Sequence, residues 1–137
     1  MHTKLVLFSF ALLFLSFTPP AQLKIEINDL KNNKGHLLLE FSDAEENVIK
    51  EITQKVENYS CIILIDGLKP GNYSFKYFHD ENDNKKMDTN IIGMPKEGFG
   101  FSNNATGTFG PPKHEKTIFA FKGDTAVHCT PIYLKKQ

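Results

Sequence analysis

The feature that most constrains the fold of this chain is a one-by-one alternation of apolar and polar residues over several short segments. Such a period of two residues is typical of a half-buried β-strand. Turn residues separate the segments, and no long helical pattern competes with them. Strands are predicted at residues 23–28, 37–41, 61–65, 73–77, 117–121 and 126–130. The pattern predicts an all-β protein, an antiparallel β-sandwich of about seven strands with one domain and one core.

Three segments carry more detailed predictions. A turn at residues 32–35 indicates that the first two strands form a hairpin. The continuous apolar run at residues 61–65 is typical of a central strand. Residues 43–58 leave two interpretations open, a short helix and an edge strand.

Two single residues add to this picture. Pro131 indicates that the last strand lies at a sheet edge, because proline cannot donate a hydrogen bond to a neighbouring strand. Tyr73 follows a turn at Pro70 and Gly71, where a tyrosine hydroxyl can anchor the corner of a sandwich.

The first 21 residues predict a secretory signal peptide. A basic start precedes an apolar run of 13 residues at 5–17, and Pro19 and Pro20 follow it. A membrane-spanning helix needs about 20 residues, so this run is short for an anchor. An uncleaved anchor is the alternative. Cleavage after Ala21 leaves a mature domain at residues 22–137, with no transmembrane segment, expected in the periplasm, on the outer cell surface or in the medium.

The charge composition argues against nucleic acid as a partner. The chain has 16 basic and 16 acidic residues, and every basic one is lysine. Recognition of phosphates and base edges favours the guanidinium group of arginine, which is absent. No nucleic acid binding is therefore expected.

Two cysteines, Cys61 and Cys129, fall in predicted strands. In an oxidising compartment an even pair suggests one disulfide. Two buried, unpaired thiols are an equally weighted alternative.

Residues 79–112 depart from the strand pattern over more than thirty positions. Long loops in compact domains are usually functional, internally braced or disordered. An ordered loop is expected here because its apolar side chains can pack it against the domain. These side chains are Ile91, Ile92, Met94, Phe99, Phe101 and Phe109.

The start of this segment carries oxygen ligands at the spacing of a calcium loop. The ligands at positions 1, 3, 5, 7 and 9 are Asp80, Asn82, Asn84, the carbonyl of Lys86, and Asp88. Lys85 replaces the usual glycine at position 6 and Ile91 the usual glutamate at position 12, so affinity in the weak extracellular range of about 0.1 to 1 mM is expected. Glu97 is a candidate for the missing carboxylate. The alternative is a cluster of Asx turns without metal.

The second half of the segment predicts a ligand platform. Aromatic faces beside amide groups suit sugars or peptides, although inward packing of the aromatic residues is commoner. The candidate ligand-binding residues of the whole segment are His79, Glu97, Phe99, Phe101, Ser102, Asn103, Asn104 and Phe109. Asn103 and Asn104 also tolerate left-handed backbone conformations, so a complex turn is the alternative.

The combined motifs resemble a bacterial exported family called DUF2141, a domain of unknown function, over nearly the whole mature chain. The matching positions are Leu68, Pro70, Gly71 and Tyr73, residues 78–82 with Asn84, residues 87–90, Gly93, Pro95, residues 97–98, 100–105 and 109–112. The resemblance implies a small immunoglobulin- or transthyretin-like sandwich of a Gram-negative envelope. It implies no activity.

Catalysis is the weaker prediction. His79 and His114 are candidates for a small hydrolase, but Ser102 lacks the frame of a nucleophile elbow. A buried His79 that braces the loop is preferred, and no enzymatic activity is expected. The chain is predicted to be an exported binding or structural module for a carbohydrate, a peptide or an envelope protein. Assembly through an exposed edge strand is a third hypothesis.

Overall fold

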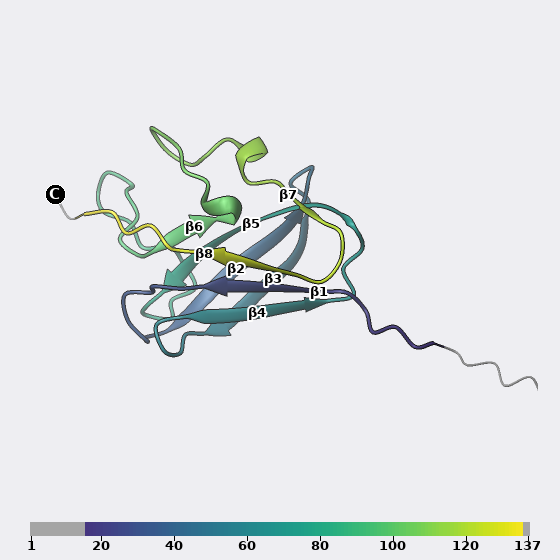
Figure 1. Ribbon diagram of the computed structural model, residues 1–137. Helices are drawn as coiled ribbons and strands as arrows, with labels where there is room; N and C mark the ends of the chain where they lie inside the picture. The colour runs from purple at the N-terminus through teal and green to yellow at the C-terminus, as the bar shows by residue number, and fades with distance from the viewer. Residues whose placement is uncertain (1–15, 136–137) are drawn as a thin grey trace, which may run out of the picture.

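The computed structural model describes residues 16–135 and forms two β-sheets around one core. The first sheet has the strand order β4-β1-β8, with β1 at Gln22–Ile27, β4 at Cys61–Asp66 and β8 at Thr125–Cys129. The second has the order β3-β2-β5-β6, with β2 at His36–Asp43, β3 at Val48–Lys55, β5 at Gly71–Asp80 and β6 at Phe99–Phe101. Strand β7, Phe119–Phe121, also pairs with β5. Figure 1 shows the three strands of the first sheet in front of the second.

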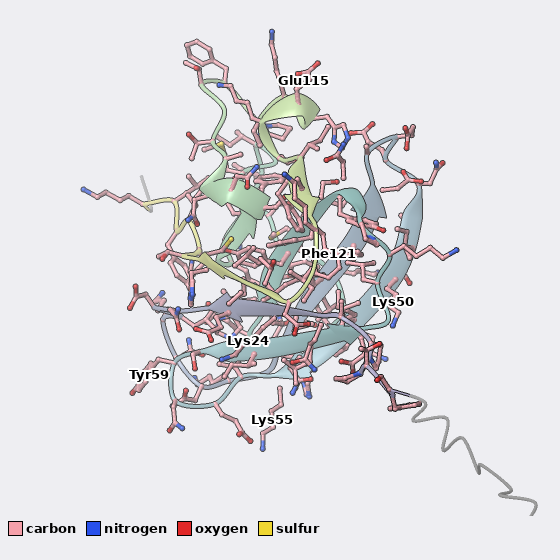
Figure 2. All side chains as sticks on the ribbon, turned by 45° about the vertical axis from the view of Figure 1, so that its right-hand side comes forward. Lys24, Lys50, Lys55, Tyr59, Glu115 and Phe121 are labelled. Atoms are coloured by element: carbon pink, nitrogen blue, oxygen red, sulfur yellow. The ribbon has the colours of Figure 1, made fainter. Side chains whose placement is uncertain are left out.

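Between the two sheets, alternate residues of most strands are buried, as the period of two predicts. Along β1 and β4 every second side chain is buried, and the core runs from Leu23 to Cys129. Phe121 lies inside the molecule, whereas Lys24 and Lys50 point to its surface (Figure 2). Because the core begins at Leu23, a chain that starts at Gln22 keeps all of it and is expected to fold on its own.

The predicted hairpin between the first two strands is wrong. β1 pairs with β4 and β8, whereas β2 pairs with β3 and β5, so the two strands belong to different sheets. The connection crosses the core edge, where Leu30 is buried and Asp29 adopts a left-handed φ of 59°. The turn residues at 32–35 therefore belong to a connection between the two sheets and not to a β-hairpin.

The prediction of a central strand at residues 61–65 is also wrong. β4 lies at the edge of its sheet, and its outward residues Ile62 and Leu64 are about half exposed. The last strand, β8, lies at the opposite edge as Pro131 indicated, but it runs parallel to β1. The first sheet is therefore mixed, and the second is antiparallel throughout its pairs.

Residues 43–58 resolve into the edge-strand alternative, not the helix. β3 pairs with β2 along its length, and all of its residues except Ile52 are exposed. A sheet edge hides little apolar surface, which explains why the periodicity was ambiguous.

The predicted tyrosine corner is confirmed. The Tyr73 hydroxyl donates a hydrogen bond of 2.7 Å to the carbonyl of Lys69, four residues upstream. The ring stacks on Phe41 at a centroid distance of 5.3 Å, which ties the corner to the core.

The segment at residues 79–112 is not one loop. β5 continues to Asp80, and β6 interrupts the remainder at Phe99–Phe101. Gly100 is required in β6 because an added Cβ would lie 2.3 Å from the Tyr77 hydroxyl on the neighbouring strand. Two excursions result, loop A at residues 81–98 and loop B at residues 105–113, and a 3-10 turn at Ser102–Asn104 lies between β6 and loop B.

Most of the predicted signal peptide, residues 1–15, lies outside the described residues. Within residues 16–135, no helix is long and apolar enough to cross a membrane.

The two cysteines are buried free thiols in this structure, so the disulfide alternative is not met. Both face Ile27 of β1, Cys61 from β4 and Cys129 from β8. One strand lies between them, which places their Cα atoms about 10 Å apart, whereas a disulfide requires less than about 7 Å. Burial raises the pKa of the Cys61 thiol to about 12, so this cysteine is unreactive.

Candidate functional site

The outer face of the second sheet carries a row of apolar side chains. Leu38 on β2 lies opposite Phe78 on β5, and Phe78 lies opposite Phe99 on β6. Ile132, which forms a bridge with Phe99, extends the row beyond the sheet. Outward positions of a strand are normally polar, so this row is an exception to the alternation.

A second row runs beside the first and carries charge. Glu51 on β3, Glu40 on β2, Lys76 on β5 and Phe101 on β6 face one another in succession across the strands. The Lys76 ammonium lies 2.9 Å from a Glu40 carboxylate oxygen. The floor is therefore apolar along one side and polar along the other.

Loops A and B border the outer face of the second sheet on two sides, and a groove of about 1180 Å³ lies between them. Loop A contributes Met87, Met94 and Pro95, and loop B contributes residues 106–112. Ligand sites in proteins are typically concave, mostly apolar and about 300 to 1,000 Å³ in volume. The groove is therefore of a size that could hold a small or elongated ligand.

The sequence analysis identified only part of this groove. Phe99, Phe101 and Phe109 of the predicted platform line it, but Leu38 and Phe78 were missed. A signal was present: an apolar residue at an outward position breaks the alternation in the run 37–39 and again after Tyr77.

The expectation that apolar side chains pack the long segment down is wrong for most of them. Ile91 and Phe109 are fully exposed, Ile92 is 75 % exposed and Met94 is 44 % exposed. Hydrogen bonds of backbone groups and of polar side chains brace loop A instead.

The predicted calcium-loop residues converge at the start of loop A. Asp80 is buried at the end of β5, and its carboxylate accepts hydrogen bonds from the backbone N–H of Asn84 (3.2 Å) and Lys85 (2.7 Å). The side-chain amides of Asn82 and Asn84 donate to the two carboxylate oxygens of Asp88 at 2.6 and 2.8 Å. The side chains of Asn82, Asn84 and Asp88 thus contact one another, and Asp80 holds the backbone of the same turn.

Lys85 occupies the position of the usual glycine in the conformation that glycine supplies. Its φ is 60°, in the left-handed region, which gives the sharp turn that a calcium loop requires at position 6. The sequence departure at this residue therefore does not change the path of the loop.

Glu97 closes the loop from outside, as the sequence analysis considered. Its two carboxylate oxygens accept hydrogen bonds from the backbone N–H of Glu81 (3.0 Å) and Asp88 (3.1 Å). Burial raises the pKa of Glu97, and the nearby negative charges of Asp88 and Asp80 raise it further, against the lowering effect of the two backbone donors. A cation near Glu97 would favour the ionised form of its carboxyl group, because opposite charges attract.

Carboxylates alone do not make a metal site here. Within residues 16–135, no group of three or more His, Cys, Asp or Glu side chains is placed to hold a metal ion. The predicted ligand set depends in addition on two asparagines and the carbonyl of Lys86, which are ligands that calcium accepts.

The His79 side chain joins β5 to the β1–β2 connection and to the C-terminal segment, and it is not available to a ligand. The imidazole is fully buried, and Nε2 donates to the carbonyl of Lys34 at 2.6 Å. Nδ1 lies 3.4 Å from the Tyr133 hydroxyl, so both ring nitrogens are occupied.

Ser102 is likewise structural. β6 pairs with β5 at residues 76–78 and β7 at residues 71–73, which leaves Phe75 between the two partner strands. The buried Ser102 hydroxyl fills this gap, since it accepts from the Phe75 N–H at 3.0 Å and donates to the Thr117 carbonyl at 2.5 Å.

The neighbouring asparagines join the sheets and do not face the groove. Asn103 donates to the carbonyls of Lys116 and Ile118, at 3.1 and 2.8 Å. Asn104 accepts from the N–H of Thr130 and donates to the carbonyl of His128. Both have left-handed φ values, 61° and 50°, so the turn alternative describes this stretch and the amides are not part of a platform.

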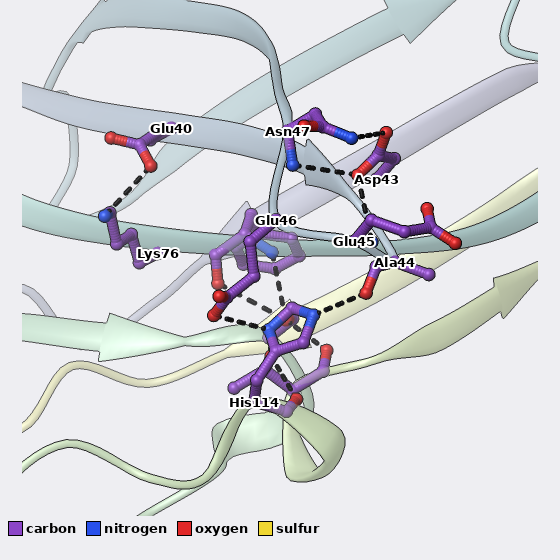
Figure 3. A network of polar contacts seen from close by, with 11 residues as sticks. Glu40, Asp43, Ala44, Glu45, Glu46, Asn47, Lys76 and His114 are labelled. Atoms are coloured by element: carbon purple, nitrogen blue, oxygen red, sulfur yellow. Dashed lines mark hydrogen bonds and ion pairs between the residues drawn. The ribbon is translucent and has the colours of Figure 1, made fainter.

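His114 lies in a separate polar network (Figure 3). Nε2 donates to the carbonyl of Ala44 at 2.8 Å, and Nδ1 lies 3.2 Å from Glu46. Beside it, hydrogen bonds from Asn47 lower the pKa of Asp43. His79 pairs with Leu37 at the other end of β2, seven residues from Ala44, or about 23 Å along the strand. The two histidines therefore do not share a site.

Comparison with known proteins places this chain in a family. Residues 25–128 match the model of an uncharacterized protein family conserved in bacteria, DUF2141. The chain belongs to DUF2141. Searches of curated proteins and of solved structures give no match. The Gly-Phe-Ser-Asn-Asn stretch of this DUF2141 chain, residues 100–104, lies within the matched range, and its Ser102 and Asn103 side chains bond backbone carbonyls of neighbouring segments.

Proposed function

We propose that this DUF2141 protein is an exported binding module, and that the groove on the outer face of its second sheet takes an elongated, largely apolar ligand. The observation that carries the proposal is the apolar row of Leu38, Phe78 and Phe99 under two loop walls. Burying such surface is favourable by about 25 cal/mol per Å².

The form of the groove favours an amphiphilic ligand over a sugar. Its apolar row has room for a hydrocarbon chain or for apolar side chains of a peptide, while the parallel row offers the Glu40–Lys76 pair and Glu51 to a polar group. The asparagines that would suit a sugar are engaged by backbone groups.

The test uses an uncharged fluorescent apolar probe, N-phenyl-1-naphthylamine, with the chain from residues 22–137. One probe is expected to bind per protein, with enhanced emission. Replacing Phe78→Glu puts a charge in the centre of the apolar row and should weaken binding at least tenfold, because the buried charge is costly.

The matched control is Ile62→Glu on the outer face of the other sheet, where a half-exposed apolar side chain lies outside the groove. This variant is expected to bind the probe as the wild type does. Equal loss in both variants, or no loss in Phe78→Glu, would remove the groove as the site.

We also propose that loop A binds calcium weakly and that the ion holds the groove wall. Asp80, Asn82, Asn84, Asp88 and the carbonyl of Lys86 would be the ligands, with Glu97 beside them. The left-handed turn at Lys85 and the raised pKa of Glu97 support this proposal.

The proposal of export depends on the sequence of residues 1–21. For the two sheets we infer an immunoglobulin- or transthyretin-like arrangement. Parallel pairing of the first and last strands and the tyrosine corner at Tyr73 support a sandwich of this kind.

The two other hypotheses find less support. A hydrolase that uses His79 and His114 would need them in one site, and they brace opposite ends of β2. Assembly through β3 would use an edge that carries charged residues, among them Lys50, Glu51 and Lys55, and charges on an edge strand oppose pairing with another chain.

A further inference from the structure

The tips of loops A and B display large apolar side chains that touch little of the domain. Ile91 and Phe109 are fully exposed, and Ile92 is 75 % exposed. Isolated apolar residues on a surface are common, but several at the apices of neighbouring loops mark an interaction site. Both loops line the same groove, and Figure 1 shows them on the side of the molecule where β6 lies.

Each tip is a braced turn and not a loose end. In loop A, the Asn90 side chain accepts hydrogen bonds from the N–H of Ile92 (3.0 Å) and Met94 (2.9 Å), and Asn90 N–H donates to the Met94 carbonyl (2.9 Å). The two isoleucines are thereby held outward at the apex.

In loop B, the backbone at Gly107 folds closely against Gly110 and Pro111. A Cβ at Gly107 would lie 2.3 Å from the Gly110 carbonyl oxygen. Phe109 lies at the apex between the two glycines.

Exposed lysines flank both tips. These are Lys85, Lys86 and Lys96 in loop A, and Lys113 and Lys116 at the end of loop B. Residues 81–116 hold as many acidic residues as lysines, but fewer of the acids are exposed: Glu97 is buried, and Glu81 and Asp88 are half-buried. The exposed acids are Glu115 and Asp83, which lies 2.6 Å from His36, against five exposed lysines.

We propose that the two tips dock this protein on an anionic lipid surface, with Ile91, Ile92 and Phe109 inserted below the headgroups and the lysines at headgroup level. Convex tips offer a protein partner little area to pack against, whereas a stable protein interface buries about 1,200 to 2,000 Å². A fluid interface accommodates separate apolar side chains and attracts the surrounding lysines.

The test is flotation of the chain of residues 22–137 with vesicles, because the predicted signal peptide would itself bind lipid. Vesicles of phosphatidylethanolamine and phosphatidylglycerol are compared with vesicles of phosphatidylcholine. Binding to the anionic vesicles, weakened by salt, is expected. Replacing Ile91→Ser and Ile92→Ser together should lower the partition coefficient at least tenfold. Replacing Lys86→Gln should lower it about fivefold.

The matched control replaces Ile62→Ser and Leu64→Ser, which are about half exposed on β4. This control is expected to bind vesicles as the wild type does. The isoleucines of loop A do not line the groove, so their replacement should leave binding of the apolar probe unchanged and separates this proposal from the groove.

Three results would overturn the proposal. In the first, the wild type does not float with anionic vesicles. In the second, the tip variants float as well as the wild type. In the third, the wild type forms a dimer without lipid in sedimentation, and the tip substitutions convert it to a monomer. The last result would assign the tips to a second copy of the chain.

Discussion

At the scale of single residues, the polar side chains at 102–104 bond the backbone. Ser102 replaces a strand partner for Phe75, and Asn103 and Asn104 bind backbone groups of the segments beside them. Polar residues in a sequence motif therefore do not indicate a ligand site until their hydrogen-bond partners are known.

Ser102→Ala is expected to destabilise the fold by about 2 to 4 kcal/mol. The substitution leaves the buried N–H of Phe75 and the carbonyl of Thr117 without the hydroxyl, and each unsatisfied buried group costs about 1 to 3 kcal/mol. Urea unfolding measures the change. The control Ser60→Ala, at a less buried site where the hydroxyl bonds the carbonyl of Glu57, should cost less than about 1 kcal/mol. Equal effects would contradict the role given to Ser102.

Glu97 should give a pH dependence of known sign in the absence of calcium. Its pKa in the folded protein is raised above the ordinary value of 4.5, chiefly by burial. The protonated form therefore stabilises the fold at low pH, and this contribution is lost as pH rises through the raised pKa. The free energy of unfolding of the wild type, relative to Glu97→Gln, should fall in EDTA as pH rises above the ordinary value of 4.5 and through the raised pKa. A difference that grows with pH would contradict this assignment.

At the scale of elements, loop A shows what spacing can and cannot predict. The spacing of Asp80, Asn82, Asn84 and Asp88 predicts a calcium loop, and in the structure Asn82 and Asn84 contact Asp88 while Asp80 holds the backbone of the same turn. Calcium binding itself stays a prediction. Glu97 was a candidate from the sequence, but spacing alone could not show its hydrogen bond to Asp88, which depends on the pairing of β6 with β5.

Calcium is expected to raise the melting temperature of the chain of residues 22–137. At about ten times the dissociation constant, binding to the folded state adds about 1.4 kcal/mol, or about 5 °C for a domain of this size. Asp88→Asn should abolish the rise. The control Asp29→Asn removes a charge from an exposed residue that makes no hydrogen bond or ion pair with loop A among those described, and it should retain the rise. A melting temperature that calcium leaves unchanged would leave the cluster as hydrogen-bonded turns.

At the scale of the whole molecule, local pattern predicted most strands but not their neighbours. Alternation located β1, β2, β5 and β8, a continuous apolar run located β4, and Tyr73 located a corner, because these depend on residues near in sequence. The hairpin of β1 with β2 failed because sheet membership depends on which strands share the core face, and β6 was missed because three residues carry too short a pattern.

The candidate site was predictable only in part for the same reason. Phe99 and Phe101 stood out in a region without strand pattern, whereas Leu38 and Phe78 looked like ordinary strand residues. Only the register of β2, β5 and β6 places the four side chains on one face under two loops.

The central claim is that this face binds an apolar ligand, and the most direct test is an NMR titration of the chain of residues 22–137 with N-phenyl-1-naphthylamine. We predict saturable shifts of backbone amides at Leu38, Phe78 and Phe101 and in loops A and B, with little change in β1, β4 and β8. Shifts confined to β4 and its exposed Ile62 and Leu64, or spread evenly over the surface without saturation, would contradict the claim.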